Sequence, residues 1–349
     1  MANEFIIAPE RLHEFVVSLF GKLGVPSGDA GMVADNLIDA DLRGVTTHGV
    51  TRIPSYIEKF EQKLCFADNK PEIIKDFGAT AQIDAHHTLG QVSSTMAMKL
   101  AIKKAEQFGI GYVGVKDSSH NGTAGYYAMM ALEHDMIGWS ITNASTKVVP
   151  FGGIERRLGT NPIAYAIPAK RHLPVLLDMA TSKVAQGKLM VAGKKNVPIP
   201  DDWALDINGN PTTDTEEALK GLLLPLGYKG YGLAVVVDML SGVLNSTGFG
   251  SVVNTATDYP QIGHAFMAIK IEAFADADEF KNNVDALIDE ITTVKLAKGT
   301  EKVYMPGEIE FDIKTENLKK GGVPLQPFQI AELSAAAEKY GLNPSEYFL

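Results

Sequence analysis

A series of short apolar runs, rich in β-branched residues and separated by glycines, constrains the fold of this 349-residue chain more than any other feature. Continuous apolar runs of this length are typical of strands that are buried in an α/β protein. The runs are Ala81–Asp84, Ile110–Val115, Ile137–Thr142, Ile163–Ile167, Val175–Asp178 and Ala265–Ile271. Helical patterns lie between and after them, over residues 92–108, 123–135, 230–244 and 276–297, and we expect the helix at 230–244 to be buried. The pattern therefore predicts an α/β body.

The two ends of the chain have a helical pattern instead. The apolar side chains of residues 9–23 fall on one helical stripe, formed by Leu12, Phe15, Val16, Leu19 and Leu23. Ser27 can cap a second helix that runs to about Leu42, and residues 326–342 form a last helix that ends at Gly341. We therefore expect the first 60 residues to form helical hairpins that lead into the segment around His48.

The change of pattern predicts two domains. We expect a helical domain of residues 1–75, completed by residues 311–349, and an α/β domain of residues 76–310. Within them, residues 61–80 have the polar character of a connection. Residues 183–228, with many Gly, Pro and Lys, are expected to form a long excursion from the α/β domain.

Composition excludes several classes of function. The net charge of −10, with scattered lysines and arginines, argues against nucleic acid and anionic membrane surfaces as partners. The single Cys65 excludes an internal disulfide and a cysteine zinc cluster. The chain does not start with a signal-like segment and its apolar runs are too short to span a bilayer, so we expect a cytoplasmic protein. We expect no metal site, because the side chains of the adjacent His86 and His87 diverge.

Three side chains capable of chemistry, His48, Arg52 and Tyr56, lie four residues apart. On a continuous helix they would share one face. Pro54 is tolerated only in the first turn of a helix, so we expect the helix to start near residues 50–51, with His48 in the turn before it. A proton donor, a guanidinium and free backbone N–H groups would then be able to hold a small carboxylate. The alternative is that His48 caps a helix and Arg52 is a solvated charge.

Small hydrogen-bonding residues also follow or precede consecutive predicted strands. Ligands of α/β sheets sit at the carboxyl ends of strands, so these segments together predict a ligand groove. The segments are Asp117–Gly122, with His120 as a candidate acid–base group, Thr142–Ser145, Gly159–Pro162 and Asp178–Ser182. Taken singly, His120 would be an incidental loop histidine. Asp178 could bind a ribose hydroxyl or cap the next segment, and Lys229 could meet a phosphate at a helix start or be a solvated lysine.

One motif match is rejected. Residues 109–114, Gly-Ile-Gly-Tyr-Val-Gly, fit the dinucleotide-binding fingerprint letter for letter. That fingerprint requires a strand before it and a helix after it, whereas here a helix precedes and a strand follows. A nucleotide, if bound, must be held by another architecture.

Several of these segments, in this order, resemble the malate/L-lactate dehydrogenase family that lacks a Rossmann fold. The resemblance runs almost from end to end and rests on Arg43–Arg52, Gly152–Pro162, Leu177–Ser182, Pro198–Thr213 and Lys229–Leu233. It implies a non-Rossmann α/β fold with a mixed central sheet, and a homodimer whose active site lies near the subunit interface. It also implies an oxidoreductase that uses NAD or NADP on small 2-hydroxy or 2-oxo acids such as ureidoglycolate, malate or lactate. The α/β domain would then bind the cofactor.

The resemblance also assigns roles by position. His120 is similar to the proposed general base of ureidoglycolate dehydrogenase, and His48 to the proton donor of the reductase branch. Substrate-contact positions are matched by Thr47, where serine is usual, and by Arg52 and Tyr56. Cofactor-contact positions are matched by Ala144, Asn161, Asp178, Met179, Ala180, Lys229, Pro306, Gly307 and Glu308. The short loop Leu224–Lys229 resembles ureidoglycolate dehydrogenase more than the archaeal malate enzymes.

These roles predict a mechanism. Arg52 pairs with the substrate carboxylate, and a histidine removes the hydroxyl proton as hydride leaves the neighbouring carbon. We expect His120 to be that histidine, with His48 polarising the same oxygen or binding substrate. Two alternatives stay open: a reductase of other oxo acids or cyclic imines, and a catalytically inactive binding protein on the same scaffold.

Overall fold

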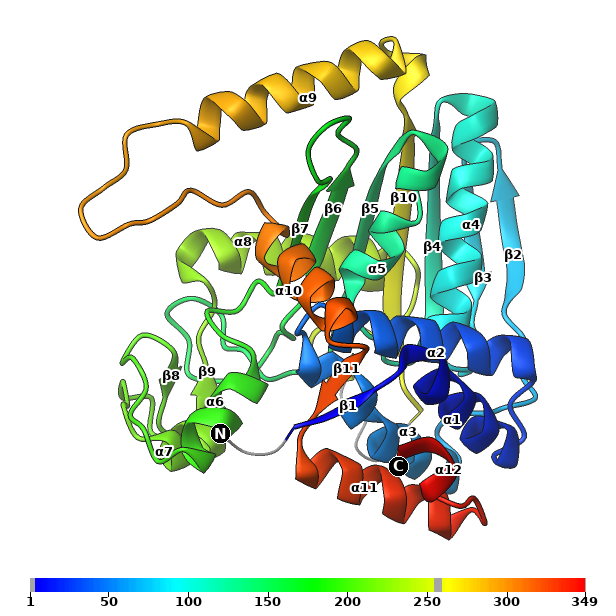
Figure 1. Ribbon diagram of the computed structural model, residues 1–349, viewed down its shortest axis with the longest axis vertical. Coiled ribbons are helices and arrows are strands. Elements are labelled where there is room, and N and C mark those ends of the chain that lie inside the picture. The colour runs from blue at the N-terminus through cyan, green and yellow to red at the C-terminus, as the bar shows by residue number, and fades with distance from the viewer. Residues whose placement is uncertain (1–3, 254–258, 349) are drawn as a thin grey trace.

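The computed structural model describes residues 4–253 and 259–348 and has a seven-stranded mixed sheet in its α/β body (Figure 1). The strand order is β2-β3-β4-β10-β5-β6-β7; β3 and β4 are parallel and the other neighbouring pairs are antiparallel. The strands are β2 (Glu72–Phe77), β3 (Thr80–Asp84), β4 (Ile110–Ser118), β5 (Met136–Thr142), β6 (Ile163–Ile167), β7 (Val175–Met179) and β10 (Ile262–Lys270). The predicted α/β fold with a mixed sheet is confirmed, and a strand is present at each predicted run.

Strand β2 corrects the prediction that residues 61–80 are only a connection. It lies at the edge of the sheet beside β3, and all of its residues are exposed. An edge strand without a buried face shows no alternation of apolar and polar residues, so its sequence does not reveal it.

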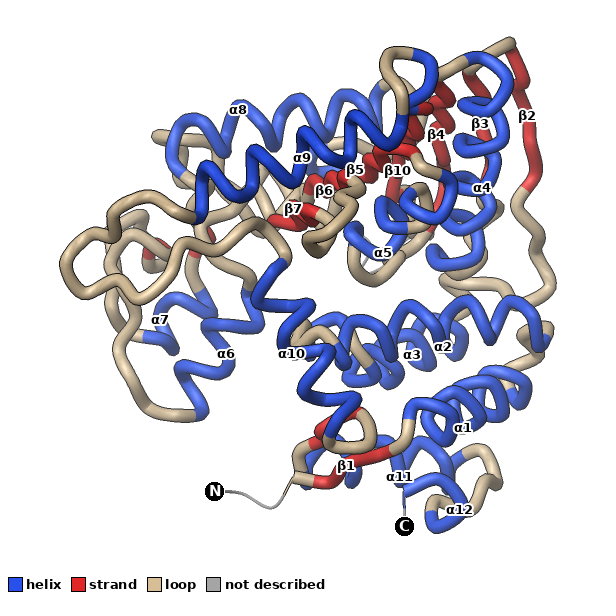
Figure 2. The backbone as a smooth tube through the Cα atoms, turned by 45° about the horizontal axis from the view of Figure 1, so that its top comes forward, coloured by secondary structure: helices blue, strands red, loops and turns tan. Residues whose placement is uncertain are grey.

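Helices cover both faces of the sheet (Figure 2). On one face lie α4 (Gly90–Phe108) and α5 (Ala124–Met129), which share an apolar core with β3, β4 and β10. On the other lies α8 (Gly227–Asp238), whose Val237 packs with Trp139 and Ile141 of β5. Helix α9 (Ala277–Thr292) follows β10. Among the described residues, no helix has both the length and the apolar character that crossing a bilayer requires.

The connection from α4 to β4 explains why the fingerprint match has no nucleotide-binding geometry. Gly109 follows α4 directly with a φ of +82°, and β4 begins at the next residue. Glycine adopts this left-handed conformation without strain, so it ends the helix and lets the strand start. The predicted order of helix before strand is confirmed.

Helix α8 corrects a second expectation. It continues as one π-helical turn, Met239–Val243, but the predicted buried helix is only partly buried in the single chain. Large apolar side chains remain exposed along it: Leu233, Val236, Met239, Val243 and Leu244. An exposed apolar surface of this kind is typical of an interface.

The two chain ends build a separate apolar core. Helices α1 (Pro9–Lys22), α2 (Ser27–Leu42) and α3 (Ile53–Glu61) pack with the C-terminal α11 (Pro327–Lys339) and α12 (Ser345–Phe348). Strand β1 (Phe5–Ile7) pairs with β11 (Val323–Leu325), and α10 (Glu308–Lys319) leads into β11. Ser27 is the first residue of α2 and not its cap.

The predicted excursion, residues 183–228, contains short elements. They are α6 (Gln186–Lys194), β8 (Ala204–Leu205), α7 (Thr215–Lys220) and β9 (Leu222–Leu223). Apolar residues of this segment form a cluster with Val148, Leu158 and Ala234 of the α/β body. The excursion is therefore packed on the body.

One edge of the sheet collects the polar strand ends. Strands β3, β4, β5 and β7 run in the same direction and end there, while β6 and β10 begin there. Helix α2 lies across this edge (Figure 1). The helical core thereby faces the carboxyl ends of the strands, where ligands of α/β sheets bind.

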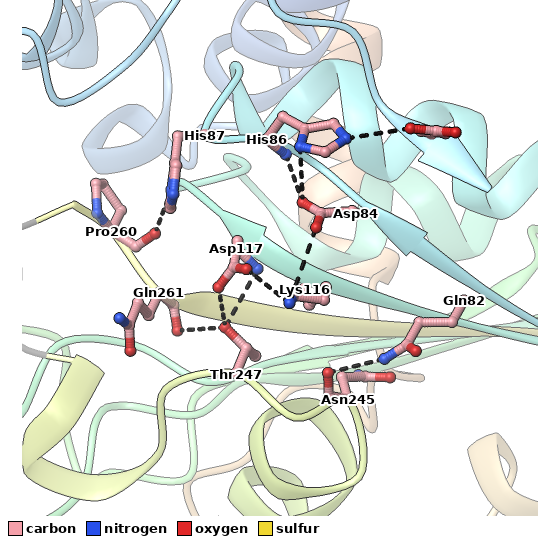
Figure 3. Close-up of polar contacts among 11 residues, drawn as sticks. Gln82, Asp84, His86, His87, Lys116, Asp117, Asn245, Thr247, Pro260 and Gln261 are labelled. Carbon is pink, nitrogen blue, oxygen red and sulfur yellow. Dashed lines mark hydrogen bonds and ion pairs between the residues drawn. The ribbon is translucent and has the colours of Figure 1, made fainter. Parts of the chain in front are cut away.

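A polar cluster fixes the end of β4, from which His120 follows (Figure 3). Lys116 Nζ lies 3.0 Å from the Asp117 carboxylate and 3.8 Å from that of Asp84. Asp117 has a φ of +49°, and its Oδ1 accepts the Thr247 hydroxyl at 2.9 Å. The chain therefore leaves β4 along a path held by side chains from β3 and from the segment before β10.

Candidate active site

Two 3₁₀ turns, Thr46–His48 and Val50–Arg52, lie at the centre of the site and are separated by Gly49. The α-helix α3 begins only at Ile53, and Pro54 lies in its first turn as predicted. The predicted start at residues 50–51 is corrected, because the chain forms a tighter 3₁₀ turn there before the α-helix. His48 ends the turn before that entry, close to its expected place.

The rings of His48 and His120 stack, with centroids 5.6 Å apart and an interplanar angle of 26°. Tyr56 Oη lies 2.8 Å from His120 Nδ1 and accepts the Gln91 side-chain N–H at 2.9 Å. The structure thus brings together three predicted site residues from a 3₁₀ turn, from α3 and from the loop after β4.

The hydrogen bonds define which nitrogen of His120 carries the proton. The Gly122 N–H, which can only donate, points at His120 Nδ1 at 3.2 Å. Gln91 donates to the Tyr56 oxygen, so the phenol hydrogen is free to point at the same Nδ1. Nδ1 is then an acceptor, and the neutral ring carries its hydrogen on Nε2. His48 is less constrained, because its Nδ1 faces the Thr47 hydroxyl at 3.0 Å, which can donate or accept.

Burial keeps both histidines neutral at pH 7. It lowers the pKa of His48 to about 4, with the positive charge of Arg52 as a second cause. The pKa of His120 is well below its ordinary value, again because of burial first and then because of Arg52. A neutral imidazole is the form that can accept a substrate proton.

Arg52 is the centre of a group of cations. Its Nε donates to the Thr47 carbonyl at 2.6 Å, and no carboxylate pairs with it within the part of the chain that the structure describes. The pKa values of Lys59 and Lys147 are lowered, mainly by burial and also by the charge of Arg52. Lys147 Nζ donates to the neutral Gln186 amide at 2.6 Å. Such a group is suited to an anionic ligand.

Asp178 lies at the end of β7, beside the first turn of α5. Its Oδ2 accepts the Gly125 N–H at 2.8 Å, in the first turn of α5. Its side chain keeps exposed surface, although the surrounding protein raises its pKa by desolvation. Asp178 therefore does not cap the segment that follows it, as the second interpretation had it, but holds the start of α5; its carboxylate still has lone pairs for a ligand hydroxyl.

Two further predicted cofactor positions are joined to each other. Asn161 is fully buried, and its Oδ1 accepts the Ala144 N–H at 3.2 Å. Its Nδ2 donates to the Ala234 carbonyl of α8 at 3.0 Å. Asn161 thus has internal partners at both ends of its amide, and it sets the backbone of Ala144 after β5. Met179 and Ala180 lie two strands away, at the end of β7.

The remaining predicted cofactor positions flank β7 and begin α8. The Pro306 carbonyl accepts the Leu176 N–H at 2.9 Å, and Gly307 has a φ of +84° against the Leu176 backbone. Glu308 pairs with Lys302 and starts α10. Lys229 is exposed in the first turn of α8. An acidic strand end and a cation at a helix N-terminus fit the ribose and the phosphates of a nicotinamide dinucleotide.

Some residues of the site were not found from the sequence. Gln91 orients the Tyr56 phenol, and Lys147 adds a cation near Arg52. Arg43 is almost fully buried; its Nε donates to Asp39 at 2.8 Å and its Nη2 to the Thr123 hydroxyl at 3.3 Å. The sequence places Arg43 at the start of the stretch that leads to His48, but it carries no signal for the burial of Arg43 or for its contact with Thr123.

Comparisons with known proteins agree along the whole chain. The family model described as malate/L-lactate dehydrogenase matches residues 7–334. The chain is 43% identical to the malate dehydrogenase of Pyrococcus horikoshii over 98% of this chain and 97% of that protein. It is 34% identical to the ureidoglycolate dehydrogenase (NAD(+)) of Escherichia coli (strain K12), over 91% of this chain and 92% of that protein.

A solved structure gives the same result. The sulfolactate dehydrogenase from Methanocaldococcus jannaschii has a TM-score of 0.92 and 40% identity, with 99% of this chain and 100% of that chain covered. Whole-chain identity is thus higher to these archaeal proteins than to the ureidoglycolate enzyme. It does not support the greater resemblance to ureidoglycolate dehydrogenase that the short loop Leu224–Lys229 suggested.

Proposed function

The chain belongs to the malate/L-lactate dehydrogenase family, and we propose that it transfers a hydride between a nicotinamide cofactor and a small 2-hydroxy acid. The observation that carries this is the stacked pair of neutral histidines, His48 and His120, beside Arg52, which pairs with no carboxylate of the described residues. A proton carrier next to an unpaired guanidinium is what the oxidation of a hydroxy acid needs.

The substrate of this site is an acid with a second anionic group. Arg52 takes the carboxylate beside the reacting carbon. Lys147 and Lys59 add positive charge that a lactate-like monoacid would leave without a partner. Malate and sulfolactate, which the names of relatives mention, both carry such a second group.

The hydrogen bonds favour His48 as the residue that moves the proton. His120 keeps its hydrogen on Nε2 because Nδ1 accepts from Gly122, so that nitrogen can hold the substrate oxygen but cannot take another proton. Thr47 can accept from His48 Nδ1 and leave His48 Nε2 free as the base. The expectation that His120 is the base stays a prediction, and His120→Gln and His48→Gln test it. The glutamine at 120 keeps an N–H donor, so activity survives there only if His120 is not the base.

The cofactor, NAD or NADP, supplies the hydride acceptor when it is bound. Asp178 to Ala180 and Pro306 to Glu308, around β7, would hold its ribose side, and Lys229 its phosphates. Ala144, fixed by Asn161, would contact it from β5. These residues belong to the proposed cofactor-binding domain of residues 76–310, and the substrate residues to the helical domain of residues 1–75 with 311–349. Hydride transfer would then occur between the domains.

The exposed apolar face of α8 supports a homodimer. Its exposed Leu233 and Val236 follow Lys229 in the same helix, and the exposed Met239 and Val243 lie in the π-helical turn after it. A second copy of the chain over this face would cover the apolar surface and bring the subunit interface next to the cofactor residues.

The deciding experiment is an oxidation assay of the purified protein with NAD and with NADP over malate, sulfolactate, ureidoglycolate and lactate. We expect reduction of the cofactor with malate and sulfolactate at a higher kcat/KM than with lactate. Titration of NADH, followed by its fluorescence, separates the alternative. Binding of NADH without turnover of any acid would favour a catalytically inactive binding protein.

A further inference from the structure

Asp41, in the last turn of α2, is a buried carboxyl group for which the proposed mechanism has no use. Only 1% of its surface is exposed. It does not pair with the neighbouring Arg43, whose Nε is bonded to Asp39 at 2.8 Å. Its Oδ2 accepts the Val50 N–H at 2.7 Å, and its Oδ1 has no hydrogen-bond partner in residues 4–253 and 259–348. A buried carboxyl with one hydrogen bond costs stability, so stability alone does not account for it.

The carboxyl lies directly on the backbone of Gly49. A Cβ added to Gly49 would lie 2.0 Å from both Cγ and Oδ1 of Asp41. Gly49 is extended, with φ −85° and ψ −151°, and it separates the turn that ends at His48 from the turn that begins at Val50. The close contact therefore requires both a glycine at position 49 and a small planar group at position 41.

This contact controls the distance between two functional groups. The imidazole of His48 precedes Gly49, and Arg52 follows it by three residues and bonds back to the Thr47 carbonyl at 2.6 Å. The backbone angles of Gly49 therefore set where the imidazole lies relative to the guanidinium. The hydrogen bond from Val50 to Asp41 holds those angles from the protein core.

We propose that Asp41 is a positioning residue for the proton-transfer site: its carboxyl holds the backbone on both sides of Gly49, and thereby keeps His48 against His120 and Arg52 in place for the substrate. The inference rests on the proposed function and adds a residue to it. Asp41 touches neither substrate nor cofactor in this role, so its effect on the reaction is transmitted through the backbone of residues 48–52.

Two substitutions separate positioning from simple support of the fold. Asp41→Asn keeps a planar group with an oxygen that can accept the Val50 N–H, whereas Asp41→Leu keeps only the branching at Cγ, is bulkier against Gly49 and removes the acceptor. We expect Asp41→Leu to lower kcat/KM by about 10- to 100-fold, through both kcat and KM, because small displacements of reacting groups are costly. NADH affinity, measured by fluorescence, stays unchanged. The separate variant Asp41→Asn should keep kcat/KM within about threefold of the wild-type value.

Asp285 provides a matched control. It is also buried, and it accepts the backbone N–H groups of Lys170, Arg171 and His172 outside the proposed site. Asp285→Leu should lower the melting temperature without changing kcat/KM. If Asp41→Leu does not fold, Gly49→Ala replaces it, since the added methyl group must displace the Asp41 carboxyl. The same loss of kcat/KM is expected.

A second readout does not depend on activity. NMR titration of the His48 ring in Asp41→Leu should give a pKa different from the wild type, and Asp285→Leu should leave it unchanged. A wild type that oxidises no 2-hydroxy acid would overturn the proposed function but leave this titration to decide about Asp41. An active wild type, together with a folded Asp41→Leu or Gly49→Ala of unchanged kcat/KM and unchanged His48 titration, would overturn the inference.

Discussion

The phenol oxygen of Tyr56 lies 2.8 Å from Nδ1 of His120, and the two residues come from α3 and from the loop after β4. The contact joins the helical layer to the sheet at the centre of the site. The phenol also gives His120 Nδ1 a second donor beside the Gly122 N–H, because Tyr56 is buried and Gln91 donates to its oxygen from the other side.

Replacing Tyr56 by Phe removes the donor to His120 Nδ1 and leaves the ring in place. We expect kcat to fall about tenfold or more, the range of one buried hydrogen bond, because His120 Nδ1 then keeps only the Gly122 N–H as a donor and the ring is held less firmly. Steady-state kinetics of the purified variant measure it. Tyr126→Phe, which changes a half-buried phenol away from the histidine pair, is the matched control. Equal kinetics in the two variants would contradict the role of Tyr56.

The pH dependence of the reaction should have two different acid limbs. In the free enzyme the pKa of His48 is about 4, lowered by burial and then by Arg52. The acid limb of the kcat/KM profile reports the free enzyme. Its apparent pKa should therefore lie below the ordinary histidine pKa of about 6.5. A bound carboxylate offsets the charge of Arg52 and raises the pKa of His48, so the limb of kcat should lie at a higher pH. A kcat/KM limb above about pH 7 would contradict this.

Replacing Arg52 by Lys should affect substrate binding more than turnover. Lysine keeps the charge but cannot form the planar bidentate pair with a carboxylate. We expect KM for the 2-hydroxy acid to rise about tenfold or more, with a smaller change in kcat and no change in NADH affinity. Arg171→Lys, which changes an exposed arginine that pairs with Asp289, is the control. A normal KM in Arg52→Lys would exclude Arg52 as the carboxylate ligand.

Asp41 should make the stability of the protein pH-dependent. Burial raises its pKa from 3.8 to about 7, so between these values the folded state binds a proton that the unfolded chain releases. Burying the charged carboxylate is what costs stability, so this cost is absent below pH 3.8, and the folded state loses stability as the pH rises to about 7. Asp41→Asn has no titrating group at this position, so it lacks this pH-dependent contribution to the free energy of unfolding. Its free energy of unfolding relative to the wild type should therefore increase between pH 5 and pH 8, by on the order of 2 kcal/mol. Urea unfolding at both pH values measures it, and a constant difference would argue against a raised pKa.

A charge on the exposed face of α8 should prevent assembly. Val236 is 51% exposed in the single chain, and a glutamate there would be desolvated and unpaired if a second copy covered the face. We expect Val236→Glu to be a folded monomer where the wild type is a dimer, as measured by sedimentation. Lys99→Glu, on the opposite side of the sheet, should leave the dimer intact.

The prediction of the fold from the sequence succeeded where the pattern is local. The stripe of Leu12, Phe15 and Leu19 and the apolar strand runs report burial directly, because helix and strand periods determine which side chains share a face. It failed at β2 and at α8. An exposed edge strand has no pattern, and an apolar helix has the same sequence whether its own chain or another one covers it.

The residue types that carry the chemistry could be identified from the sequence. Spacing and strand ends pointed to His48, Arg52, Tyr56 and His120. The structure brings the two histidines and Tyr56 together. Only the tertiary structure decided how they act. The contact of His120 with Tyr56, the group that orients Tyr56 and the carboxyl that holds the backbone at Gly49 come from other segments of the chain. Hydrogen bonds between segments distant along the chain leave no periodic pattern, and the burial that lowers the pKa of His48 exists only once those segments have packed.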